Sequence, residues 1–360
     1  MPKRERQRGT WMSLTPPVLL AAIAAIAWVS VTRALARPEA REQDWPAESQ
    51  AEAQNLTSLS SEFEDDLSGA VWNPVKRQLW LCRNGPGLES RLWVLDQSPD
   101  GSLHVSVREN VRGEWARIGD CEGVALASFE EPLVYLLAEG SESILTLDTS
   151  LYGVVAIRNQ YDLSEFLPSE GKAGAEGIAF VPDVHLEAAG FRDARGKKRV
   201  SRLGMGGLMF VGHQNGGGLF AFDLNPSTEE VEHVGEYRVL APSDEGGAPI
   251  SRVVGLEFDR ASGVLLAWHG LKKRNVLSLL RLSSSTVEEQ SYRSLDSIAL
   301  YSGPSQASFE GIAWAVSPSQ LNQGSLYLTV DDGKADSLFR FDQFELASSG
   351  SEGPPQAENE

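Results

Sequence analysis

The sequence predicts an all-β protein, a β-propeller with five four-stranded blades, with six blades as the alternative count. Three observations support this expectation. A short phrase ending in glycine occurs five times, an apolar strand with a glycine turn follows each copy, and the repeating unit is about 50 residues long, as a propeller blade is. A β-sandwich with coincidental glycine-rich turns is the competing fold.

The first phrase introduces the first strand of each unit, because an apolar alternation follows every glycine. Its copies are Asp66-Leu67-Ser68-Gly69, Asp120-Cys121-Glu122-Gly123, Gly174-Ala175-Glu176-Gly177, Val253-Val254-Gly255 and Ser308-Phe309-Glu310-Gly311. The glycines at positions 69, 123, 177, 255 and 311 are separated by 54, 54, 78 and 56 residues. The long interval contains an insertion at roughly 184–203, and discounting it restores the period.

The remaining strands of each unit follow in a constant order. Second strands are LWLCRNG, VYLLAEG, MFVGHQNG, LLAWHG and LYLTVDDG; third strands are RLWVLD, SILTLD, LFAFDL, VLSLLRL and SLFRFD. Fourth strands are expected at LHVSVREN, VVAIRNQYDL, VEHVGEYRVL and VEEQSYRSL, so the fifth unit lacks one. A strand-like stretch at 56–63 precedes the first unit. We expect this N-terminal strand to complete the last blade and close the ring, which removes the open sheet edges.

Residues 1–36 predict a signal peptide or a signal anchor, with the apolar run as a helix. Four cations precede an apolar run from about Leu14 to Val31, which has the length of a minimal bilayer span: Lys3, Arg4, Arg6 and Arg8. Residues 34–36 (ALA) offer a cleavage pattern between two arginines, so cleavage and retention both stay open. The basic flank directs the rest of the chain across the membrane. We therefore expect an extracytoplasmic protein, in the periplasm or anchored at the cell membrane.

Charge and composition limit the partners. The chain carries 50 Asp and Glu against 32 Lys and Arg, a net charge of −18, which disfavours nucleic acid. Residues 37–54 are predicted as a solvated linker, 55–347 as the propeller and 348–360 as a disordered tail. The two cysteines, Cys82 and Cys121, are predicted to approach each other from neighbouring blades, either as a disulfide or as two buried thiols.

The repeated phrases resemble those of two groups of exported propellers. The segments DCEGVAL from Asp120, GAEGIAF from Gly174 and LSGAVWNP from Leu67 are similar to the SdiA-regulated propellers and to the family described as esterase-like activity of phytase. The resemblance covers roughly residues 56–347. It implies a calcium-associated propeller and suggests hydrolysis of phosphate or carboxyl esters. The fourth repeat departs from the pattern, with Val254 where an acid is expected and Glu257 two residues after Gly255.

Antiparallel strands bring the start of each first strand and the end of each second strand to one face of the propeller, around its channel. The predicted metal ligands are Asp66, Asp120, Glu122, Glu176 and Glu310. The predicted ligand-binding residues are Arg83, Asn84, Glu139, His213, Asn215, His269, Asp331 and Asp332. Crowded carboxylates repel unless a cation compensates them, and Ca²⁺ suits an oxygen-only site. The alternative is that these acids only accept backbone N–H bonds.

The expected function is therefore the binding of a metal ion or a small ligand at the acidic channel face, by a protein of the cell envelope. Calcium-dependent ester or phosphate-ester hydrolysis is the alternative, and the catalytic residues are not identified. The sequence contains no G-x-S-x-G, Walker A or HExxH motif. The insertion is basic and is predicted either to contact an anionic lipid or acidic partner or to be a solvated loop; its cations are Arg192, Arg195, Lys197, Lys198, Arg199 and Arg202.

Overall fold

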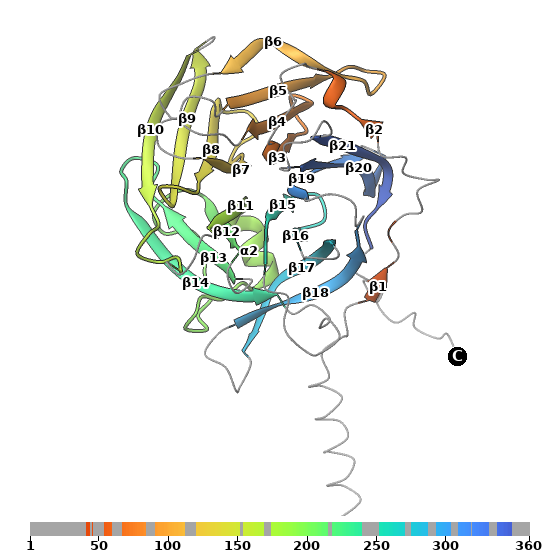
Figure 1. The fold of residues 1–360 in the computed structure, drawn as a ribbon. Helices are drawn as coiled ribbons and strands as arrows, with labels where there is room; N and C mark the ends of the chain where they lie inside the picture. Colours follow the sequence, from red (N-terminus) through yellow and green to blue (C-terminus); the bar gives the residue numbers. More distant parts are fainter. Residues whose placement is uncertain are drawn as a thin grey trace, which may run out of the picture. The chain divides into compact units, whose positions relative to one another are not determined.

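The computed structural model describes residues 41–43, 45, 54–59, 67–83, 91–111, 120–151, 154–168, 174–214, 218–239, 252–270, 275–286, 293–303, 309–317, 319–330 and 337–347. These residues form a ring of five four-stranded blades (Figure 1). The predicted all-β class and the five-blade count are thus confirmed. The predicted signal or anchor segment and the C-terminal tail lie outside the described residues. Within the described residues, no helix is both long enough and apolar enough to cross a membrane.

Each blade is an antiparallel sheet whose first strand lies at the axis. The blades are β3 (Leu67–Asn73), β4 (Gln78–Arg83), β5 (Arg91–Gln97), β6 (Leu103–Val111); β7 (Cys121–Ala125), β8 (Leu133–Ala138), β9 (Ser143–Leu151), β10 (Val154–Asp162); β11 (Ala175–Pro182), β12 (Gly207–His213), β13 (Gly218–Leu224), β14 (Val231–Val239); β15 (Gly255–Asp259), β16 (Val264–Gly270), β17 (Asn275–Thr286), β18 (Arg293–Ser302); and β19 (Phe309–Ser317), β20 (Gln320–Val330), β21 (Leu338–Glu345), β2 (Gln54–Asn55).

Blade packing explains why the central strands are apolar on both faces. Every residue of β12 and β13 is buried, because each blade has a neighbour on either side. Five hydrophobic clusters result, each shared by two adjacent blades. At the junction of the last and first blades, for example, the rings of Trp72 and Tyr327 stack with centroids 6.1 Å apart. The fold therefore depends on contacts between blades as much as on contacts within them.

The N-terminal strand closes the ring, although not in the predicted stretch. Strand β2 pairs antiparallel with β21, with Gln54 opposite Arg340 and Asn55 opposite Phe339. Residues 57–59, inside the predicted strand at 56–63, form a 3₁₀ turn instead, and residues 60–63 lie outside the described residues. The NH group of Leu56 donates to the carbonyl of Leu338 at 2.9 Å, after which the chain turns towards the first blade. The closing strand β2 therefore lies two residues before the apolar stretch at 56–63 in which it was predicted.

The predicted linker at 37–54 contains ordered structure that its polar composition did not indicate. Strand β1 (Arg41–Gln43) pairs in parallel with β18. Strand β2, the outer strand of the last blade, begins at Gln54, the last residue of the predicted linker. Trp45 packs edge-on against Trp268, Phe341 and Phe344, with ring centroids 5.0–5.8 Å apart. Even a partly buried tryptophan offers a large apolar contact, so this part of the segment is attached to the last two blades.

The third and fourth blades are joined at their outer edges. Strand β14 pairs in parallel with β18, through Tyr237 opposite Arg293 and Val239 opposite Leu295, so the two blades form one continuous sheet. The insertion of the third blade lies beside this junction and contains α2 (Asp183–Ala189). Leu186 and Phe191 are buried in the cluster between these blades. The insertion is therefore a packed part of the domain, and the prediction of a solvated loop is wrong for these residues.

Candidate cation site at the propeller axis

Five glycines let the first strands approach one another at the axis. A Cβ added to Gly69 would lie 2.7 Å from the Cα of Gly123, and one added to Gly177 would lie 2.9 Å from the Cα of Gly255. A Cβ on Gly123 would lie 2.8 Å from the Cγ2 of Ile178. These distances are too short for any side chain. The recurrent glycine of the repeat is therefore required by the close approach of neighbouring backbones.

The same contacts close the ring. A Cβ on Gly255 would overlap the carbonyl oxygen of Glu310, and one on Gly311 would overlap the carbonyl oxygen of Ser68 in the first blade. The space between the glycines is a cavity of about 10 Å³, close to the smallest that holds one water molecule. The axis is thus nearly filled by backbone, and the residues just before the glycines form its entrance.

Three glutamates converge at this entrance, one from each of three blades. Glu122, Glu176 and Glu310 directly precede the glycines of β7, β11 and β19, and one carboxylate oxygen of each lies within 4.8 Å of the other two. Glu122 is 4% exposed and Glu176 is 3% exposed. Ca²⁺–oxygen distances of about 2.3–2.6 Å place two ligands of one ion at most about 5 Å apart. All three carboxylates can therefore reach one ion.

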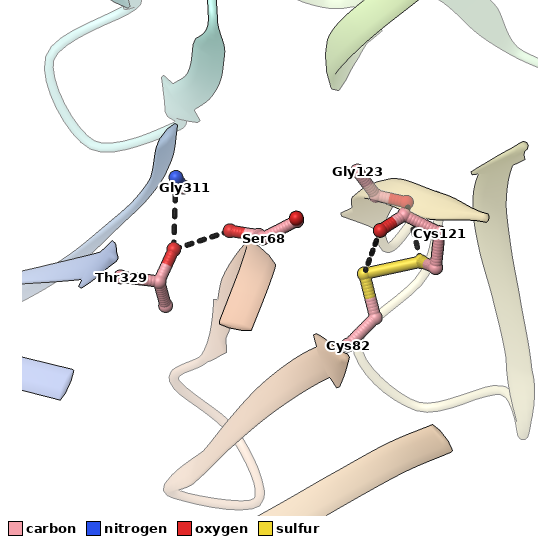
Figure 2. Close-up of a disulfide and its surroundings, with 6 residues drawn as sticks. All are labelled: Ser68, Cys82, Cys121, Gly123, Gly311 and Thr329. Carbon is pink, nitrogen blue, oxygen red and sulfur yellow. Dashed lines mark hydrogen bonds between the residues drawn. A yellow bond between two sulfur atoms is a disulfide. The ribbon is translucent and has the colours of Figure 1, made fainter. Parts of the chain in front are cut away.

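The equivalent positions of the other two blades are Ser68 and Val254. Ser68 is fully buried, and its hydroxyl has no hydrogen-bond partner among the described residues. In Figure 2 this hydroxyl points away from Thr329, to which the carbonyl of Ser68 is bonded. A buried hydroxyl without a partner is costly. The repeat places Ser68 at the position that a glutamate occupies in three of the other blades. Val254 supplies an apolar wall instead of a ligand.

Thr329 holds the last blade against the first beside this entrance. Its hydroxyl accepts a hydrogen bond from the NH of Gly311 at 2.8 Å and donates to the carbonyl of Ser68 (Figure 2). This bridge fixes the strand that carries Glu310 relative to the strand that carries Ser68. Thr329 lies within the second-strand phrase LYLTVDDG, but the other four second strands have no threonine at the matching place, so the repeat did not single it out.

A disulfide holds the first two blades together at the same level. Cys82, in β4, is bonded to Cys121, at the start of β7, with Cα atoms 6.1 Å apart (Figure 2). Of the two predicted alternatives, the structure shows the disulfide. Cys121 immediately precedes Glu122, so the bond restrains the backbone that carries one of the three glutamates. The entrance is thus held on one side by a covalent bond and on another by the Thr329 bridge.

The remaining predicted residues are distributed differently. Asp120 and Glu139 lie at neighbouring strand ends, where the NH of Glu139 donates to the carbonyl of Asp120 at 3.0 Å, and neither belongs to the group of three. Arg83 is partly buried, and its Nε has no partner among the described residues. Five of the predicted residues lie outside the described residues: Asp66, Asn84, Asn215, Asp331 and Asp332.

The two predicted histidines are buried inside the blades. His269 lies 2.8 Å from the carbonyl oxygen of Arg252 through Nδ1 and 2.9 Å from the hydroxyl of Ser278 through Nε2. Both ring nitrogens are therefore occupied, and burial lowers the pKa of His269 to about 4. His269 was expected at a turn and instead lies in the core of its blade, and its ligand-binding role stays a prediction. His213 is fully buried against Phe220, with ring centroids 6.1 Å apart.

Glu257 lies deeper along the axis, in a second cavity of about 10 Å³ that it lines together with Ile178, which also lines the cavity between the glycines. Burial raises the pKa of Glu257 well above its usual value of 4.5, Asp259 raises it further, and Arg260 lowers it. The departure of the fourth repeat, seen in the sequence, therefore places an acid inside the apolar part of the channel.

We expect Glu257→Gln to change the pH dependence of stability. Between the unfolded pKa near 4.5 and the higher folded pKa, the unfolded chain loses this proton while the folded protein keeps it, so wild-type stability falls as pH rises. The glutamine variant lacks this loss, so its stability relative to wild type should rise as the pH is raised above the unfolded pKa. Chemical denaturation at several pH values measures it. The exposed Glu187→Gln is the control, and parallel pH curves for wild type and Glu257→Gln would contradict the expectation.

Comparisons with known proteins find only distant similarities, all with solved structures. No family model matches the chain, and no curated protein matches it. Among solved structures, Sqt1 of Saccharomyces cerevisiae is similar over 75% of this chain and 61% of its own, at 12% identity and a TM-score of 0.38. The Dos1 propeller is similar over 78% and 59%, at 13% identity and a TM-score of 0.34. A protein from Lactobacillus plantarum is similar over 73% and 63%, at 8% identity and a TM-score of 0.36.

Proposed function

We propose that this propeller binds a divalent cation at the entrance of its axis, through Glu122, Glu176 and Glu310, and that Ca²⁺ is the ion that fits best. The single observation that carries the proposal is the convergence of three carboxylates from three separate blades within 4.8 Å. Ionised carboxylates at this separation repel one another, and folding holds them together on inner strands. A bound cation turns that repulsion into attraction.

Oxygen is the only ligand type in the group, which favours a hard cation over zinc or copper. The buried hydroxyl of Ser68 stands at the same level and supplies a fourth oxygen to the proposed site. Because Ca²⁺ takes six to eight oxygens, four protein ligands leave further positions for water or for an oxygen-bearing small ligand. The proposed function is therefore metal-dependent binding of a small ligand at this face.

We also propose that the domain works outside the cytoplasm, in the periplasm or at the cell membrane. The predicted signal or anchor segment supports this address, and so does the Cys82–Cys121 disulfide, since such bonds persist in oxidising compartments. The resemblance to the SdiA-regulated and esterase-like phytase propellers stays a prediction that agrees with a calcium-binding, exported domain.

Calcium titration of the thermal stability tests the site. A metal that binds only the folded state stabilises by RT ln(1 + [L]/Kd), about 2.7 kcal/mol at a hundredfold excess over Kd. We expect Glu176→Gln to lose most of this increment, because it removes one charged ligand at nearly constant shape. Without calcium, the same variant should be slightly more stable than wild type, since one member of a like-charge group is gone.

The control is Glu187→Gln, which removes an exposed acid from α2, outside the inner strands that carry the three glutamates. It should keep the full calcium increment. An acid that merely accepts backbone N–H bonds gives a different pattern, because Glu176→Gln would then destabilise equally in EDTA and in calcium. An unchanged calcium increment in Glu176→Gln would refute the site.

A further inference from the structure

The insertion and the paired strands β14 and β18 line a pocket of about 540 Å³ that is open to solvent. It is separate from the axial glutamates: Glu176 stands at the start of β11, whereas the insertion follows the end of β11. The pocket is unusually basic for a chain with a net charge of −18. Its charged lining comprises six cations and three acids, namely Arg195, Lys197, Arg199, Arg202, Arg238, Arg293, Asp193, Glu232 and Glu236.

The three acids are already engaged by the protein. Glu232 pairs with Arg199 at 2.5 Å, and Glu236 pairs with Arg238 at 2.6 Å. The carboxylate of Asp193 accepts the backbone NH groups of Arg195 and Lys197, at 2.9 Å each. These bonds leave a surplus of positive charge in the pocket.

The six cations of the lining exceed its three acids by three positive charges. No ion pair joins the side chains of Arg195, Lys197, Arg202 or Arg293 to any acid within the described part of the chain. Like charges gathered in one pocket repel one another and so favour a bound anion. The first three side chains are exposed and can adjust to a ligand, whereas Arg293 is partly buried.

Two guanidinium groups also present unfilled donors. The Nε atoms of Arg199 and Arg293 are buried and have no hydrogen-bond partner among the described residues. The Arg199 side chain is 5% exposed and is held by a salt bridge to Asp223 at 3.2 Å. Buried donors without acceptors are costly, and these two line a pocket with surplus positive charge. An anion with several acceptor oxygens satisfies both requirements.

The pocket is held in shape before any ligand binds. The carbonyl of Asp193 accepts the NH of Gly196 at 2.9 Å, and the guanidinium of Arg192 donates to the carbonyl of Gly196 at 2.7 Å. Gly196 has φ 80°, and a Cβ there would lie 2.5 Å from a terminal nitrogen of Arg293. The glycine therefore allows both the turn and the position of Arg293 above it.

We propose that this pocket binds a phosphate-bearing anion, with Arg293 and Arg199 donating to phosphate oxygens and the exposed cations neutralising further charge. Phosphate matches the donors because it offers several acceptor oxygens to the planar fork of arginine and carries more than one negative charge. The anion is either free in solution or the headgroup of an anionic lipid, and both have the same chemistry at the contact.

Calorimetric titration of the purified protein with inorganic pyrophosphate tests for an anion that is free in solution. Co-sedimentation with equimolar phosphatidylcholine and phosphatidylglycerol vesicles, compared with pure phosphatidylcholine, tests for a lipid headgroup. We expect saturable binding of at least one probe, weakened by added salt. Arg293→Gln should weaken it roughly tenfold or more, since a charge-assisted hydrogen bond is lost.

Lys76→Gln is the matched control, because it removes one exposed positive charge from the first blade, outside the pocket. It should bind as wild type does. If Arg293→Gln fails to fold, as judged by its melting curve, Arg195→Gln replaces it as an exposed member of the same pocket. Pyrophosphate binding identifies a free anion, and vesicle binding alone identifies a lipid headgroup. Absence of both, or equal affinities of the pocket variant and Lys76→Gln, would overturn the proposal.

Discussion

Replacing both cysteines by alanine should lower the free energy of unfolding by about 4 kcal/mol. Cys82 and Cys121 are 39 residues apart, and closing a loop of this length in the unfolded chain costs about that much on the chain-entropy model. Both cysteines are buried in the cluster between the first two blades, so the smaller side chains add a packing loss. Denaturant unfolding of wild type and the double variant measures the difference.

Reduction provides the control. A strong reductant should destabilise the wild-type protein and leave the double alanine variant unchanged, because only the wild type has a bond to lose. The calcium increment should also fall in the double variant, since Cys121 directly precedes Glu122 and holds its backbone. Wild-type stability that is insensitive to reduction under unfolding conditions would contradict the expected contribution of the bond.

Gly311→Ala should cost about 3 kcal/mol or more, which is the upper range for inserting a methyl group into a packed site. The added Cβ would overlap the carbonyl oxygen of Ser68 and the hydroxyl of Thr329, so either the last blade or the first must move. The movement would break the bridge that Thr329 makes between the two blades. Thermal and denaturant melts measure the loss.

Gly270→Ala is the matched control. A Cβ at this position would lie 3.3 Å from the Cγ2 of Val254, the nearest atom, and Gly270 does not have a positive φ. The substitution should therefore cost much less than Gly311→Ala. Equal losses for the two variants would mean that close approach at the axis is not what requires glycine in the repeat.

The three glutamates could be predicted because the repeat and the fold together determine their position. The phrase before each first strand sets Glu122, Glu176 and Glu310 in the same register, and a closed ring brings equal registers to one level at the axis. The same reasoning brings Cys82 and Cys121 together, but only the structure shows that they form a disulfide, because two neighbouring cysteines are equally compatible with free thiols.

Other features could not be predicted, because they depend on contacts between residues that are distant in the sequence. The polar segment before the propeller gave no sign that Trp45 packs on the last two blades. The basic composition of the insertion is compatible with a solvated loop, yet the side chain of Arg199 is buried and forms a salt bridge with Asp223 of β13. The sequence pattern predicted His269 at a turn, whereas its ring lies in the core with a hydrogen-bonding neighbour at each nitrogen.

The sequence by itself determined the fold class, favoured five blades over six and set the level at which three carboxylates meet, because a repeat with one glycine per unit leaves few ways to pack its apolar strands. Only the tertiary structure decided where the closing strand pairs, which acids converge and which remain apart, and how the insertion forms a basic pocket. The physical reason is that periodicity specifies positions within a blade, whereas pairing, burial and charge compensation between blades depend on side chains brought together only by closure of the ring.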